Sequence, residues 1–117
     1  MTKIQIFKQK GNIKGFIVSG HSGYAESGSD IVCSAVSSLS QMVCVGLENV
    51  LNLHPEIVIE EENAYLSCFL NESLVSVKEY EKAQVLFQSF AFSVELLLKG
   101  DKKLKKYISM EVKNEIY

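Results

Sequence analysis

The longest uninterrupted pattern in the chain is helical, and the other segments must fold around it. From Ser29 or Asp30, each a favoured N-cap residue, to about Leu53, apolar side chains recur at three- and four-residue steps. The dipeptide His54-Pro55 ends the pattern, because the residue before a proline is driven out of helical geometry. The sequence therefore predicts a helix over about 29–53, with a buried stripe made of Val32, Val36, Leu39, Val43, Leu47 and Val50.

Another stripe of the same helix is small and polar where the first is bulky. It carries Cys33, Ser37, Gln41 and, more loosely, Cys44. We expect one side of this helix to be buried and the other to be available for function.

A second long helix is predicted to begin at the capping-box pattern Ser76-x-x-Glu79. Gly100 is a plausible C′ residue for its end. Apolar residues lie on more than one side of this helix, which suggests a subunit interface in so small a domain. The expected core stripe is Val77, Tyr80, Ala83, Phe87, Phe90, Val94 and Leu97, and the residues off that stripe are Leu86, Phe92 and Leu96.

The remaining segments are predicted to be strands. Residues 4–8 and 13–19 form a hairpin around the turn signal Lys10-Gly11-Asn12, residues 57–61 and 65–70 form a second hairpin, and residues 107–112 form a last strand. The order is ββαββα plus a final strand. The expected fold is an α+β two-layer sandwich, with two helices packed on one mostly antiparallel sheet in a single domain over residues 1–117.

Charge and composition exclude several classes of protein. A net charge of -2 argues against broad binding to a phosphate backbone, so no direct nucleic-acid binding is expected. A lysine cluster near the C-terminus is read as a solvated helix end and turn: Lys99, Lys102, Lys103, Lys105 and Lys106. No apolar run approaches the length of a membrane span, and no signal-peptide core opens the chain, so a cytoplasmic location is expected.

Three cysteines without CxxC spacing fit free thiols in a reducing compartment and give no support for a zinc site or other metal site. The predicted helix start places Cys33 in or just after the first turn, where unpaired backbone N–H groups and the helix dipole favour a thiolate. His21 follows the second strand, and an imidazole can activate a thiol for attack on a carbonyl. The pair therefore fits a cysteine hydrolase.

The loop between the second strand and the first helix is rich in glycine, with Gly20, Gly23 and Gly28, which permit unusual backbone angles and hinge motion. Tyr24 either closes over a substrate side chain or packs on the domain. Asp30 and Ser37 are alternative candidates to orient the histidine, and their plainer interpretations are an N-cap and a helix-surface serine. For the pair itself, the plainer interpretation is a loop histidine and a buried structural cysteine.

The segments Gly-His-Ser-Gly-Tyr-Ala at 20–25 and Gly-Ser-Asp-Ile-Val-Cys-Ser-Ala-Val-Ser at 28–37 resemble the motif of the ribosomal-processing cysteine proteases, the Prp family, with the spacing intact. The resemblance implies a protease with His21 and Cys33 as its catalytic dyad. It also implies that Gly20, Gly23, Tyr24, Asp30 and Ser37 support the site or bind substrate, and that the enzyme is a homodimer.

The implied substrate is the N-terminal extension of the twenty-seventh protein of the large ribosomal subunit in bacteria, cut after a pair of aromatic residues. No cofactor is implied. The alternative functions are a non-catalytic ribosome-associated binding module and a thiol redox sensor that uses Cys33. The redox sensor lacks an evident resolving cysteine, because Cys44 lies three turns further along the predicted helix.

Overall fold

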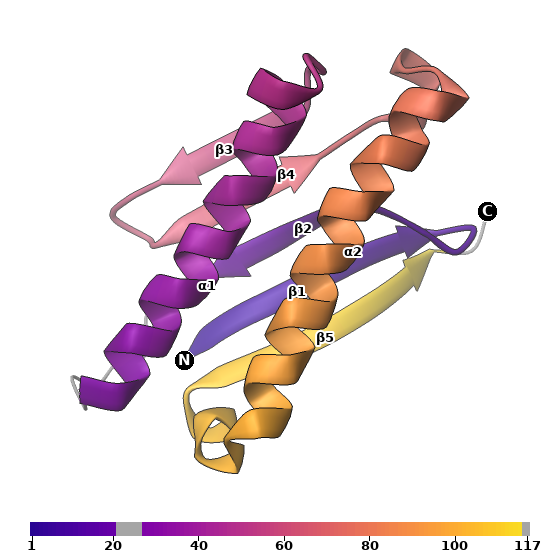
Figure 1. Ribbon diagram of the computed structural model, residues 1–117. Coiled ribbons are helices and arrows are strands. Elements are labelled where there is room, and N and C mark those ends of the chain that lie inside the picture. The colour runs from indigo at the N-terminus through magenta and orange to yellow at the C-terminus, as the bar shows by residue number, and fades with distance from the viewer. Residues whose placement is uncertain (21–26, 116–117) are drawn as a thin grey trace.

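Two helices cover one face of a five-stranded sheet in the computed structural model, which describes residues 1–20 and 27–115 (Figure 1). The α+β sandwich and the order ββαββα plus a final strand are both confirmed. The elements are β1 (Thr2–Gln9), β2 (Asn12–Ser19), α1 (Ser27–Val45), the π-helical segment η1 (Gly46–Val50), β3 (Glu56–Glu60), β4 (Tyr65–Phe69), the 3₁₀ turn η2 (Glu72–Leu74), α2 (Val77–Gly100), the 3₁₀ segment η3 (Lys102–Lys106) and β5 (Ile108–Glu115).

The strand order across the sheet is β3-β4-β2-β1-β5. Three of the four pairings are antiparallel, and β5 runs parallel to β1 with Ile108 opposite Thr2. A parallel pair needs a crossover connection. The connection from β1 to β5 contains the other three strands and both helices. The first strand is therefore held on both sides, and its first residue lies inside the assembled sheet rather than at a free end.

The first hairpin turns tightly at Lys10 and Gly11, whose φ angles are 53° and 83°. Two central residues with positive φ are the mark of a type I′ turn, whose twist matches that of the flanking strands. This confirms the predicted turn. Behind it, the buried side chain of Gln84 on α2 accepts a hydrogen bond from the amide of Ile13 at 2.8 Å and donates one to its carbonyl oxygen at 2.7 Å.

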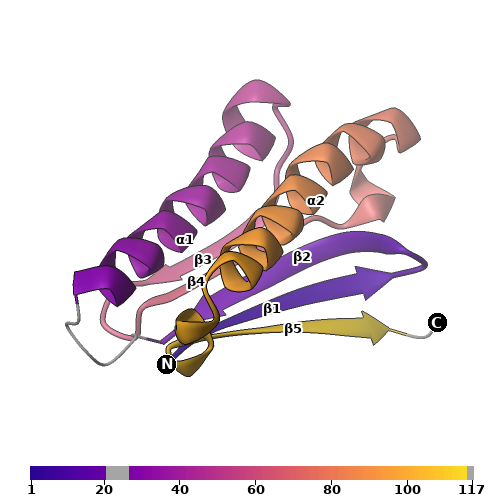
Figure 2. The same ribbon diagram turned by 60° about the horizontal axis from the view of Figure 1, so that its bottom comes forward.

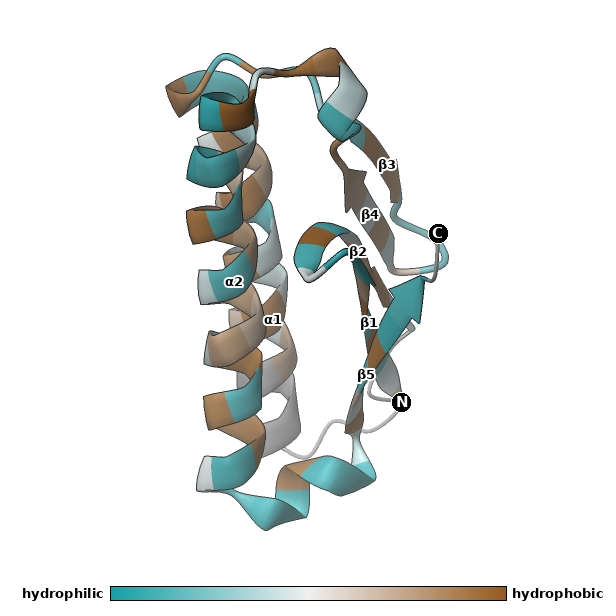
Figure 3. Cartoon of the chain, turned by 90° about the vertical axis from the view of Figure 1, so that its right-hand side faces the viewer, coloured by the Kyte–Doolittle hydropathy of each residue, from teal (hydrophilic) through white to brown (hydrophobic). Residues whose placement is uncertain are grey.

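The core lies between the helices and the sheet. Figure 3 shows the two layers side-on, with hydrophobic residues along β2 and β4 and hydrophilic ones toward the end of β5. The ring of Phe16 on β2 lies 4.5 Å from that of Phe90 and 6.2 Å from that of Phe87, measured between centroids. Among the described residues, no helix is long and apolar enough to cross a membrane.

The first helix differs from its prediction at both ends. It begins at Ser27, so Ser29 and Asp30 are its third and fourth residues and not its N-cap. Near its other end it widens into η1, where the amide of Leu51 donates to the carbonyl of Gly46 at 2.9 Å. This five-residue step turns the stripe, which explains why Val50 is 72% exposed and not part of the core.

The second helix follows its prediction more closely. The capping box of Ser76 and Glu79 is present in both directions, and the predicted stripe from Tyr80 to Val94 is buried. Val77 is exposed instead, because it is the first residue of the helix and lies beyond the edge of the core. Gly100 is the last helical residue rather than a C′ residue.

Candidate active site

The end of the molecule that Figure 2 brings forward is where β1, β5 and α1 begin. The chain leaves β2 here at Gly20, whose amide donates to the carbonyl of Ala64 at 3.1 Å. Gly20 has a φ of +88°, and a Cβ at this position would overlap the carbonyl oxygen of Met1. The backbone can turn away beside the N-terminal residues only because Gly20 has no side chain.

Thr2 connects this exit to the start of α1. Its hydroxyl donates to the carbonyl oxygen of Gly20 at 3.3 Å and lies 3.4 Å from the sulfur of Cys33. Its amide donates to the carbonyl of Tyr107 at 2.7 Å, and the residue is 4% exposed. One buried side chain thus touches both the backbone beside His21 and the thiol.

Thr2 is not among the predicted site residues, although the sequence carries a signal for it. The period of two along β1 places Thr2 on the same face as Ile4 and Ile6, which are fully buried. A hydroxyl at a core-facing position of a strand needs a hydrogen-bond partner, so the pattern predicts a buried polar contact at Thr2.

Cys33 is a partly buried residue that packs against the core. It is the seventh residue of α1 and lies in the second turn, so the prediction that placed it three or four residues past the N-cap is wrong. The unpaired N–H groups of a helix belong to its first turn, and the helix field falls off within that turn, so Cys33 lies beyond both. Side chains of a helix nevertheless lean toward its N-terminus, which directs the Cys33 side chain over the preceding turn.

The other two cysteines are core residues, so the small polar stripe expected on α1 does not extend to Cys44. Cys44 on α1 and Cys68 on β4 are buried. A hydrogen bond with Cys44, together with burial, raises the pKa of the Cys68 thiol. A neutral thiol is a weak nucleophile, so Cys68 is unsuited to attack. Of the three cysteines, Cys33 is the one that is partly exposed.

The remaining predicted site residues divide into two groups. His21, Gly23 and Tyr24 lie outside the described residues. Asp30 is the fourth residue of α1. Ser37 is exposed one turn beyond Cys33, where its hydroxyl accepts a hydrogen bond from Gln41 at 3.2 Å, a contact within the helix surface.

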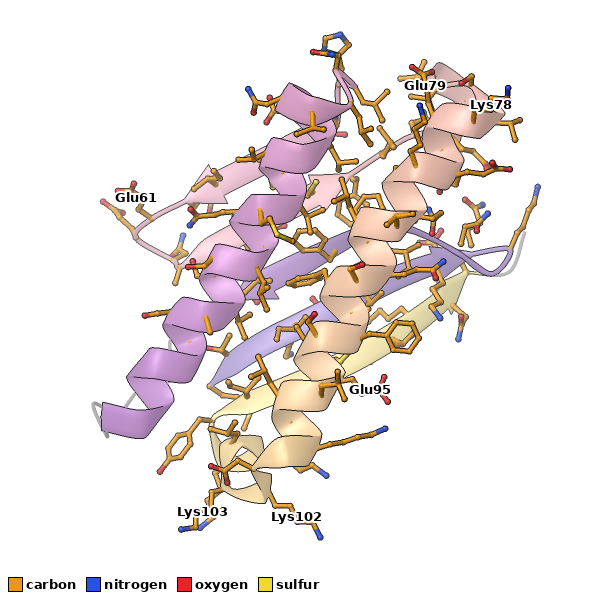
Figure 4. The ribbon with its side chains drawn as sticks, viewed as in Figure 1. Glu61, Lys78, Glu79, Glu95, Lys102 and Lys103 are labelled. Carbon is orange, nitrogen blue, oxygen red and sulfur yellow. The ribbon has the colours of Figure 1, made fainter. Side chains whose placement is uncertain are left out.

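The lysine cluster lies at the same end of the molecule as Cys33. Lys99 pairs with Glu95 at 2.8 Å along the last turns of α2, and the lysines of η3 are exposed. Figure 4 shows Lys102 and Lys103 projecting away from the two layers. This arrangement matches the expected solvated helix end.

A cavity of about 680 Å³ lies at the other end of the two layers and includes none of Thr2, Gly20 or Cys33. Two of its charged lining groups already have partners. Lys14 pairs with Glu115 at 2.5 Å, and Glu79 caps α2. Within residues 1–20 and 27–115, no cluster of His, Cys, Asp and Glu is able to hold a metal ion. Size alone does not make this cavity the better candidate. The region where Thr2 meets Gly20 and Cys33, here called the Cys33 junction, remains the site with the relevant chemistry.

Comparison with known proteins identifies the family of the chain. The sequence profile described as "Cysteine protease Prp" matches residues 1–109. The chain belongs to the cysteine protease Prp family. A search of curated protein sequences finds no match. The Prp assignment thus rests on the family profile, which spans the junction and both helices.

Solved structures share the fold over nearly the whole chain. A crystal structure of SMU.848 from Streptococcus mutans has a TM-score of 0.81 and 27% identity, covering 98% of this chain and 96% of that one. The ribosomal processing protease Prp from Staphylococcus aureus in complex with a substrate peptide has a TM-score of 0.79 and 18% identity, covering 97% and 100%. The same S. aureus protein with a covalently linked product peptide has a TM-score of 0.74 and 16% identity, with the same coverage.

Proposed function

We propose that this chain is an endopeptidase in which Cys33 is the nucleophile and His21 the general base. The observation that carries the proposal is the Thr2 hydroxyl, which contacts both the Gly20 carbonyl and the Cys33 sulfur. His21 follows Gly20 directly in the chain, so this contact links the residue before the proposed base to the proposed nucleophile. A thiol served by an imidazole is a recognised arrangement for acyl transfer.

The reaction would proceed through an acyl-enzyme. His21 takes the proton from the thiol, and the sulfur attacks the carbonyl carbon of the scissile bond. N–H groups in the first turn of α1 are suited to stabilise the oxyanion. The C–N bond then breaks as His21 returns the proton to the leaving amine. Water, activated by the same imidazole, hydrolyses the thioester and restores the thiol.

The proposed substrate is the N-terminal extension of the twenty-seventh protein of the large ribosomal subunit, cut after a pair of aromatic residues. Two observations support a peptide substrate of this kind. The motif at 20–37 resembles that of ribosomal-processing proteases. The S. aureus enzyme has been crystallised with a substrate peptide and with a covalently linked product peptide. On this proposal the enzyme works in the cytoplasm, where ribosomal subunits are assembled.

We also propose a homodimer formed through the outer face of α2. Three large apolar residues are strongly exposed there: Val85 at 66%, Phe92 at 63% and Leu96 at 69%. Their spacing of seven and four residues places them on one side of the helix. A contiguous apolar stripe of this kind is typical of a protein–protein contact.

The experiment is cleavage of a synthetic peptide that spans the aromatic junction, followed by mass spectrometry. We expect wild type to cut the peptide and both Cys33→Ala and His21→Ala to lose at least about a thousandfold in kcat/KM. His54→Ala and Cys44→Ala are matched controls, since each removes the same chemical group elsewhere in the chain, and both should retain activity. Wild type that binds the peptide without cutting it would support the binding-module alternative instead.

A further inference from the structure

We propose that Thr2 is a positioning residue for the Cys33 thiolate, with its hydroxyl turning from the Gly20 carbonyl to the sulfur when the thiol loses its proton. This inference rests on the proposed function of Cys33 and deepens it. It assigns a role in the reaction to a residue at the start of β1, outside the motif at 20–37.

The geometry defines two hydrogen-bond arrangements. The Thr2 hydroxyl carries one hydrogen and lies within reach of two groups, the Gly20 oxygen at 3.3 Å and the Cys33 sulfur at 3.4 Å. A carbonyl oxygen only accepts, so in the thiol state the S–H donates to the hydroxyl oxygen while the hydroxyl hydrogen goes to Gly20. Both contacts are then made with one hydrogen each.

Ionisation reverses the contact with sulfur. The thiol proton leaves to a base, the electron pair stays on sulfur, and the thiolate becomes an acceptor only. The Thr2 hydrogen then turns toward the sulfur and stabilises its charge, since a hydrogen bond to the ionised form favours that form. A charge-assisted bond of this kind is stronger than the neutral bond to Gly20 that it replaces.

The surroundings of Thr2 suit this role. The residue is 4% exposed, so water competes little for its hydroxyl. Its backbone is held by the bond to the Tyr107 carbonyl at 2.7 Å and by pairing with β5. The branched side chain has few rotamers, so the hydroxyl is placed before the thiolate forms. These features distinguish a preorganised donor from a passing surface contact.

The consequence is a thiol that is more reactive near neutral pH than it would be without the hydroxyl. Only the thiolate is nucleophilic, so the rate at which iodoacetamide alkylates Cys33 reports the fraction ionised at each pH. Removing the hydroxyl should lower this rate at pH 7 and move the midpoint of the rate profile to higher pH. A residue that serves only folding would not move that midpoint.

The test uses the full chain with any tag at the C-terminus, because Met1 packs against Gly20. Alkylation of Cys33 is followed by mass spectrometry from pH 5 to 10 in wild type, Thr2→Val, Thr2→Ala and Thr2→Ser. The two variants without a hydroxyl should react about three- to tenfold more slowly at pH 7. Thr2→Ser keeps the donor and should remain within about twofold of wild type.

Two comparisons make the result specific. Ser40→Ala removes a different buried hydroxyl, on α1, which donates to the Ser37 carbonyl at 2.7 Å. This variant should leave the pH profile of Cys33 alkylation unchanged. Having two variants without the hydroxyl keeps the test usable if one fails to fold. Profiles of Thr2→Val or Thr2→Ala that overlay wild type would overturn the proposal, as would a Thr2→Ser profile displaced as far as theirs.

Peptide cleavage by wild type and Cys33→Ala, measured beside the alkylation profiles, separates the two proposals. If Cys33→Ala cuts the junction peptide as wild type does, the proposed nucleophile is wrong, and the role of Thr2 in the reaction falls with it. If Cys33→Ala is inactive and the alkylation profiles of the Thr2 variants match that of wild type, Cys33 remains the proposed nucleophile and only the positioning role of Thr2 fails.

Discussion

The carbonyl oxygen of Met1 fills the space that a side chain at Gly20 would occupy. Gly20 also has a φ of +88°, where residues with a Cβ are strained. Two separate demands, one steric and one conformational, thus meet at the residue that precedes His21. The N-terminal residues and the exit of β2 at Gly20 are therefore closely packed against each other.

We expect Gly20→Ala to destabilise the fold by at least about 2 kcal/mol, because the new Cβ meets backbone that cannot easily move. Gly11→Ala is the matched control. Gly11 has a similar φ of +83° but no atom within 4 Å of the added Cβ, so it should lose only about 1 kcal/mol. Urea unfolding followed by circular dichroism measures both. Equal losses in the two variants would show that the overlap with Met1 is unimportant.

Gln84→Leu tests the buried contact between α2 and the first hairpin. The substitution leaves the amide of Ile13 without its side-chain acceptor and weakens the bonding of its carbonyl, so a loss of about 2 kcal/mol or more is expected. Gln88→Leu, one turn further along and exposed, should change the unfolding free energy by less than about 0.5 kcal/mol. A Gln84→Leu variant as stable as wild type would refute this role.

The capping box predicts a pH dependence of stability. Hydrogen bonds from the backbone and side chain of Ser76 lower the pKa of Glu79, at the opposite end of α2 from Lys102 (Figure 4). Because the folded-state pKa lies below the unfolded value, this stabilisation is present above the unfolded pKa and is lost as the pH falls through the folded pKa. We expect Glu79→Gln to lose stability less steeply than wild type on acidification below about pH 5.

The control for that titration is Glu81→Gln, which removes a carboxylate from the same helix and leaves the box intact. Its unfolding free energy should follow the wild-type pH dependence. Identical acid profiles for wild type and Glu79→Gln would contradict the linkage.

Phe92→Glu tests the proposed dimer. A charge on the apolar outer face of α2 would have to be buried on association, so the variant should dissociate at concentrations where wild type is dimeric. Leu74→Glu places the same charge at an exposed apolar position in η2, where the side chain is 77% exposed. This variant should remain dimeric. Analytical ultracentrifugation distinguishes the outcomes. A monomeric wild type, or a dimeric Phe92→Glu, would contradict the proposed interface.

Local signals predicted most of the fold, because turns, caps and periodic stripes act over a few residues. The turn at Lys10 and Gly11 and the capping box at Ser76 were both predicted and are present. Contacts between distant segments were beyond such signals. The parallel pairing of β1 with β5 joins residues more than a hundred positions apart, and no local pattern specifies it.

The candidate site shows the same division. Cys33 was identified as a candidate nucleophile from its residue type, its separation from His21 in the sequence and the motif around it. Thr2 was missed because its importance comes from the β1–β5 pairing and from the exit of β2, which bring it between Gly20 and Cys33. The start of α1 was misplaced by two or three residues because several small polar residues in succession are equally suited to cap a helix.

The central claim is that Cys33 is the nucleophile, and an affinity label tests it most directly. The label is a peptide with the sequence that precedes the aromatic junction and a chloromethyl ketone at its C-terminus, from which a thiolate displaces chloride to form a thioether. The account predicts one label per chain, located on Cys33 by mass spectrometry, and loss of peptide cleavage in proportion to labelling. A label on Cys44 or Cys68, or full cleavage activity by a chain labelled at Cys33, would contradict it.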